Sequence, residues 1–76
     1  MGVRAMPLAI VEAGRRVRLV AIKAGRGLQG RLASMGLVPG VEIEVLQNSL
    51  NGPCIVSLKG SRIILGRGMA YKIVVT

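Results

Sequence analysis

The sequence contains no histidine, phenylalanine or tryptophan, and only one cysteine and one tyrosine. Its three acidic residues are all glutamates, so aspartate is missing as well. A four-ligand zinc or iron–sulfur site within one chain is therefore excluded, because the nitrogen and sulfur ligands are absent. The lone Cys54 cannot form an internal disulfide, and we interpret it as a buried, unreactive thiol in a reducing compartment. The core must be built from aliphatic side chains.

The same shortages argue against an enzyme. General acid–base catalysis needs titratable groups held in a cleft, and the sequence offers only Glu12 and the pair Glu42 and Glu44. The glycines at positions 25, 27 and 30 have the G-x-G-x-x-G spacing of dinucleotide-binding loops, but no acid follows about 20 residues later. We expect no catalytic residue, no cofactor-binding residue and no metal ligand.

No stretch reaches the roughly 18 apolar residues that cross a bilayer. The longest uncharged run, residues 45–58, is interrupted by Gln47, Asn48, Asn51 and Pro53. We therefore interpret the chain as a cytoplasmic protein.

Positive charge is abundant. Eleven lysines and arginines against three acids give a formal net charge of +8 on 76 residues. Such an excess favours an anionic partner, which could be an acidic protein face, a membrane surface or nucleic acid. A surface charge that only keeps a small apolar domain in solution explains it equally well.

The central stretch, residues 28–45, has the clearest local signals. Leu28, Leu32 and Met35 recur at helical spacing, and Gly36 follows where a left-handed helix cap is needed. Pro39-Gly40 fits the middle of a type II turn. Beyond it, apolar residues alternate with Glu42 and Glu44, as in a half-buried strand. The pattern predicts a helix over residues 25–35, a sharp turn and a strand.

Further alternating segments cover residues 17–22, 54–58, 61–65 and 72–75, with turns between them. About five short strands at this chain length favour a mainly β fold, a small closed barrel with one short inserted helix. We predict a flexible N-terminal tail over residues 1–6 and a single barrel domain over residues 7–76.

The central stretch, written R-L-x-x-M-G-L-x-P-G-x-x-I-x-V, resembles the signature of the FeoA family of bacterial ferrous iron uptake. The likeness runs over about residues 7–76. It includes Gly52-Pro53 before the third strand, and the patterns Val56-x-Leu58-x-Gly60, Ile63-x-Leu65 and Ala70-x-x-Ile73-x-Val75. The resemblance implies an SH3-like barrel with a helix inserted after the first long strand.

By the same resemblance, the protein is expected to be a non-enzymatic accessory of iron uptake. It would bind the cytoplasmic G-protein domain of the FeoB membrane transporter, and Fe²⁺ would be linked to it through the family role only. The charge excess and an apolar loop tip suggest which side chains face the partner. We predict this interface to contain Arg26, Arg31, Leu50, Arg62 and Arg67.

One alternative comes from residues 14–32, which loosely resemble the KOW-type module of ribosomal and transcription factors. On that interpretation the protein would be a basic RNA-binding or ribosome-binding module that contacts phosphates. It requires residues 30–33 to be a strand, where the first interpretation makes them helical. The sequence also leaves a homo-oligomer open.

Overall fold

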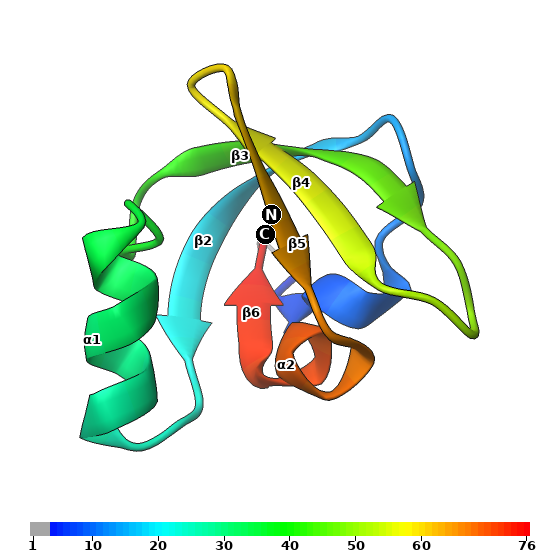
Figure 1. Ribbon diagram of the computed structural model, residues 1–76. Coiled ribbons are helices and arrows are strands. Elements are labelled where there is room, and N and C mark those ends of the chain that lie inside the picture. Colours follow the sequence, from blue (N-terminus) through cyan, green and yellow to red (C-terminus); the bar gives the residue numbers. More distant parts are fainter. Residues whose placement is uncertain (1–3) are drawn as a thin grey trace.

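The computed structural model describes residues 4–76, which form six β-strands, two α-helices and one turn of 3₁₀ helix (Figure 1). In chain order these are β1 (Met6–Pro7), η1 (Leu8–Ile10), β2 (Arg16–Ile22), α1 (Arg26–Ser34), β3 (Glu42–Asn48), β4 (Cys54–Leu58), β5 (Ser61–Leu65), α2 (Arg67–Lys72) and β6 (Ile73–Val75).

The strands form one antiparallel sheet in the order β1-β6-β2-β3-β4-β5. The sheet curls strongly, so that β5 passes in front of β6 in Figure 1. This arrangement confirms the mainly β, SH3-like barrel with a helix inserted after the first long strand. The expected complete closure is wrong, because β1 and β5 stand at the two ends of the strand order with no ladder between them in residues 4–76.

The interior is filled as the lack of aromatic residues requires. Every buried side chain among the described residues is apolar, and alternate positions of each long strand supply them. In β2, Val17 and Leu19 point inward, while β4 buries Cys54, Val56 and Leu58. Apolar burial is therefore what holds the strands together.

A two-residue turn joins β4 to β5. Lys59 has φ +50° and Gly60 has φ +83°, and Leu58 pairs with Ser61 across the turn. Positive φ at both central positions defines a type I′ turn, whose twist matches that of the two strands. The predicted reversal at this point is confirmed, and it fixes the register of the hairpin.

Helix α1 confirms the predicted helix, and its end has the predicted glycine cap. Gly36 has φ +95° and donates its N–H to the carbonyl of Ala33 at 2.9 Å, while Leu37 donates to Leu32 at 3.0 Å. These two bonds form a Schellman motif. Leu32 and Leu37 are both buried, whereas Met35 is 47% exposed. The assignment of Met35 to the packed face was wrong, because the chain already unwinds at this residue.

The predicted turn after Val38 is also confirmed. Gly40 has φ +99°, and Val41 donates to the carbonyl of Val38 at 3.2 Å. Positive φ at the third residue of the turn is the type II requirement that selects glycine. This turn starts β3 beside β2.

Strand β3 contains a bulge that the sequence pattern did not indicate. Val45 pairs with Val56 and Gln47 pairs with Ile55, so Leu46 is an extra residue on its strand. Leu46 and Gln47 both lie on the exposed side. The alternation shifts by one, and Asn48 now points inward instead of Gln47.

The N-terminal segment enters the sheet earlier than expected. Met6 of β1 pairs with Val75, and the side chains of Leu8 and Val11 are buried in the core. The domain boundary predicted at residue 7 thus falls inside β1. Of the predicted tail, residues 1–3 lie outside the described residues.

Candidate functional site

The inward shift of Asn48 creates a polar connection between distant segments. Its side-chain amide donates to the carbonyls of Leu8, Ala9 and Val11, at 3.1, 3.2 and 2.6 Å. The two N–H donors of one β3 side chain are thereby shared among three carbonyls in η1 and at its C-terminal end. Sequence reasoning missed this role, because Asn48 opens a run of turn-forming residues and looks like part of a loop.

Arg67 completes this connection from the first turn of α2. Its guanidinium donates to the carbonyl of Ala9 at 3.0 Å, to the side-chain oxygen of Asn48 and to the carbonyl of Ser49. The side chain is half-buried, and its Nε has no partner in the structure. Arg67 therefore anchors the β3–β4 loop rather than presenting a free charge.

The five residues predicted to face a partner do not form one surface. Arg26 and Arg31 are exposed on α1, at the left of Figure 1, whereas the β3–β4 loop that contains Leu50 lies at the right. Leu50 is 90% exposed, and Arg62 is exposed on β5. The interface stays a prediction. Arg26 and Arg31 lie at one end of the molecule, Leu50 lies at the other, and Arg62 lies on β5 between them.

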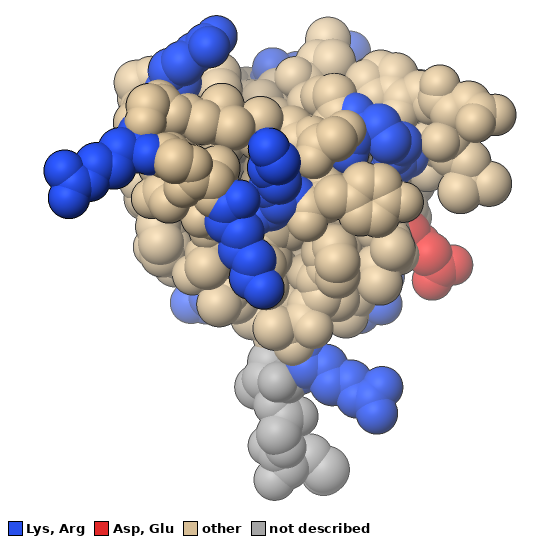
Figure 2. Space-filling view, turned by 90° about the horizontal axis from the view of Figure 1, so that it is seen from below, with Lys and Arg blue, Asp and Glu red and all other residues tan. Residues whose placement is uncertain are grey.

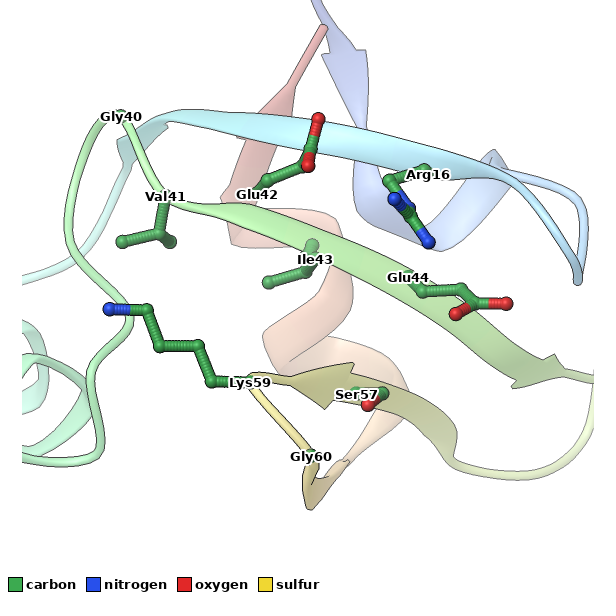
Figure 3. A pocket seen from close by; sticks show the side chains of 9 residues that line it. All are labelled: Arg16, Gly40, Val41, Glu42, Ile43, Glu44, Ser57, Lys59 and Gly60. Carbon is green, nitrogen blue, oxygen red and sulfur yellow. The ribbon is translucent and has the colours of Figure 1, made fainter.

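A shallow groove of about 630 Å³ runs along the outer face of β3. It is lined by charged and polar side chains of β2, β3, β4 and the β4–β5 turn, and includes Arg16, Glu42, Glu44, Ser57 and Lys59 (Figure 3). Arg16 stands opposite Glu44 in the strand register. Charges of both signs meet here, so the groove has no strong preference for ligands of one charge.

The two carboxylates of this groove do not converge on a common point. Glu42 and Glu44 point in different directions in Figure 3. Among residues 4–76, no three histidine, cysteine, aspartate or glutamate side chains come together in a way that could hold a metal ion. Hard cations need several oxygen ligands directed at one position, and this pair does not provide them.

Basic side chains are spread over the surface. Figure 2 views the molecule from below and shows lysines and arginines dispersed over this face, with uncharged surface between them and one acid at the margin. On this face, no continuous basic stripe of the kind that follows a nucleic-acid backbone is present.

Helix α1 also decides the RNA-binding alternative. The KOW-type interpretation needs a strand at residues 30–33, and these residues lie within the helix Arg26–Ser34. The alternative was therefore wrong. An extended segment was a reasonable expectation because Gly27 and Gly30 have low helix propensity.

Cys54 lies on β4 and is completely buried, as interpreted from its apolar neighbours. Burial raises the pKa of the Cys54 thiol above its usual value of 9.0, and the nearby positive charge of Arg67 partly opposes this shift. A buried thiol of raised pKa has little thiolate at neutral pH and is a poor nucleophile.

These observations define a class of protein: a small, mainly β module with an SH3-like fold. No helix among the described residues is long and apolar enough to cross a membrane. Residues 6–76 match the model of the FeoA domain. The chain therefore belongs to the FeoA family.

Two relatives cover nearly the whole chain. "Putative Fe(2+) transport protein A" of Methanocaldococcus jannaschii is 48% identical over 69 residues, which are 91% of this chain and 83% of that protein. A solved structure of a FeoA protein described as an iron uptake regulatory protein is 36% identical, with a TM-score of 0.87, and covers 95% of this chain and 96% of its own. Both relatives are named for iron transport or iron uptake.

The same fold occurs as part of larger proteins. A manganese-dependent transcriptional repressor in complex with manganese matches 99% of this chain with a TM-score of 0.86, at 23% identity, over 37% of its own length. At this identity the likeness concerns the fold alone.

Proposed function

We propose that this protein is a non-enzymatic accessory of ferrous iron uptake that works in the cytoplasm. It binds the cytoplasmic G-protein domain of a FeoB-type membrane transporter and adjusts transport, with Fe²⁺ as the transporter's cargo. Membership of the FeoA family, together with the relative named for Fe(2+) transport, carries the proposal.

The physical character of the chain supports a role in binding. Its titratable groups are dispersed, and its single thiol is buried with a raised pKa. A net charge of +8 attracts an acidic partner and speeds encounter with it. Exposed apolar side chains such as Leu50 and Ile64 supply area that a partner could cover.

The direct test is a titration of the transporter's isolated cytoplasmic domain with this protein, followed by calorimetry. Arg31→Glu on α1 and Arg62→Glu on β5 change the charge equally at two exposed positions of different elements. If one variant weakens binding by about tenfold and the other leaves it nearly unchanged, the affected element belongs to the interface. Absence of binding by the unmodified protein at low salt would refute the proposal.

Function in cells is tested separately. Cells that lack this protein should take up labelled ferrous iron more slowly, and the unmodified gene should restore the rate. A variant that cannot bind the transporter domain should fail to restore it, although it is folded and present at a normal level. Full uptake in cells without the protein would contradict an accessory role.

A further inference from the structure

Strand β5 is an open edge of the sheet. It is the last strand in the order β1-β6-β2-β3-β4-β5, and within residues 4–76 the element packed along it is β4. At the opposite end, β1 has two residues and finishes at Pro7. Short strands and prolines are devices that prevent pairing at sheet edges, and β5 has neither.

The register shows which backbone groups of β5 are free. Leu58 and Ser61 flank a two-residue turn, so they form a hydrogen-bonded pair, and such pairs then alternate along the hairpin. Ser61, Ile63 and Leu65 direct their N–H and C=O groups to β4. Arg62 and Ile64 direct theirs away from it. The edge therefore presents two donors and two acceptors in the geometry of a strand.

The side chains at the same two positions are also exposed. Ile64 is 67% exposed, and Arg62 is exposed beside it on the same face of the strand. None of the three glutamates lies on β5 or in its flanking turns, whereas Lys59 lies in the turn before it. The edge combines free hydrogen-bonding groups with an apolar side chain and a positive charge.

We propose that the β5 edge binds an extended acidic segment of a partner protein as an additional antiparallel strand. Such strand addition takes affinity from main-chain hydrogen bonds and specificity from the side chains opposite. In an antiparallel pair, the partner residue opposite Ile64 comes two positions before the residue opposite Arg62. An apolar residue suits the first position and an acidic residue suits the second. The recognised pattern is apolar-x-acidic.

Charge selects this occupant over a second copy of the chain. Two β5 edges could pair with each other, but each copy carries a net charge of +8, and an arginine from both would lie at the junction. Like charges close together oppose such an interface. An acidic segment removes this cost and gains an ion pair instead.

This inference deepens the proposed function and rests on it for the identity of the partner. The mode of binding is tested independently of the transporter with a synthetic peptide, Val-Thr-Glu-Thr-Val-Thr-Glu, with blocked ends. Titrated into isotope-labelled protein, it should shift the amide signals of Arg62 and Ile64 most, with a Kd of about 100 µM at low salt. It should also slow hydrogen exchange at these two amides.

Two versions of the peptide provide a matched control. Methylation of the valine and glutamate amides, which face β5 in the proposed register, should weaken binding at least about tenfold. Methylation of the threonine amides, which face away, should have less than about a threefold effect. Equal effects of the two methylations would overturn strand addition without any change to the protein.

Variants of the protein test the edge from the other side. Ile64→Pro removes a donor that faces away from β4, so the hairpin keeps its ladder and the peptide should bind at least about tenfold more weakly. Arg62→Glu should weaken binding and favour a peptide with lysine in place of glutamate. Arg26→Glu on α1 makes the same charge change elsewhere and should have a much smaller effect.

The remaining outcomes decide between occupants. Binding that shifts the groove residues around Glu44 instead, or no shift at about 1 mM peptide, would overturn the proposal. So would protection of the Arg62 and Ile64 amides that grows with protein concentration alone, since this indicates a second copy. If the transporter domain binds Ile64→Pro normally, the proposed function stands and this inference fails. If the peptide binds but the transporter domain does not, this inference stands and the proposed function fails.

Discussion

Helix α1 and the segment around η1 are attached to the same sheet in different ways. Helix α1 depends largely on apolar contact: Leu32 is buried and Leu28 is partly buried. Its polar link is local, since Gln29 donates to the carbonyl of Ile22 at the end of β2 and to that of Ala24 in the loop before the helix. The η1 segment adds a polar network to its apolar contacts, through Asn48 and Arg67. Apolar packing tolerates small shifts, whereas the network fixes the segment in one position, because its bonds depend on direction.

The largest expected effect is on the apolar side. Leu32→Ala should lower the free energy of unfolding by about 3 kcal/mol, because it removes a side chain that is 3% exposed and leaves a cavity. Chemical denaturation measures the change. Leu28→Ala, at a partly buried position of the same helix, is the control and should cost clearly less. Equal losses would show that α1 is not held by one dominant contact.

Asn48→Ala should have the next largest effect, about 2 kcal/mol, since three carbonyls and the Arg67 guanidinium lose a partner. Faster hydrogen exchange should accompany it in η1 and the β3–β4 loop, but not in α1. Gln47→Ala changes the exposed neighbour and should be nearly neutral. A loss of protection throughout the protein would mean that the network does not act locally.

Two glycine substitutions, one inside α1 and one just after it, should change the stability in opposite directions. Gly30→Ala should stabilise the protein by roughly 0.5–1 kcal/mol, because a Cβ meets nothing within 4 Å and alanine favours the helix. Gly36→Ala should destabilise by about 1–2 kcal/mol, since φ is +95° and the Cβ would lie 2.9 Å from Leu58 Cδ2. Thermal unfolding distinguishes the two. The same sign for both would refute the assigned cap.

The smallest effect concerns the Cys54 thiol. Its pKa is raised in the folded protein above the usual 9.0, so the thiol is neutral in both folded and unfolded chains near pH 7. The stabilisation that follows from this difference in pKa is complete below pH 9.0, and it is lost as the pH rises toward the pKa of the folded state. The extra fall in stability above this pH should be absent in Cys54→Ala. An identical pH profile in both proteins would contradict the shift.

What the sequence could predict was local. Gly36, Pro39 and Gly40 have conformational preferences strong enough to define the helix end and the turn without knowledge of the rest. The apolar positions of the strands followed from their period. Met35 fits the same helical period, but the helix ends before it, and periodicity alone cannot place a boundary to within one residue.

The candidate site was much less predictable, because it depends on contacts between distant segments. Arg67 looks like any surface arginine until β3 and η1 are brought beside it. The bulge at Leu46 decides that Asn48 points inward, and no residue type marks it in advance. The free edge of β5 follows from strand order and register, which a single sequence does not contain.

The position of β6 has a consequence for biosynthesis. This strand, Ile73–Val75, is inserted between β1 and β2, so the last described strand to leave the ribosome joins the first two. A nascent chain that ends before Ile73 lacks the centre of that half of the sheet. Such a chain would leave η1 and β2 without the strand that they contact, and chaperones and proteases would encounter it incompletely folded. Completion of the domain is thus delayed until translation has passed residue 75.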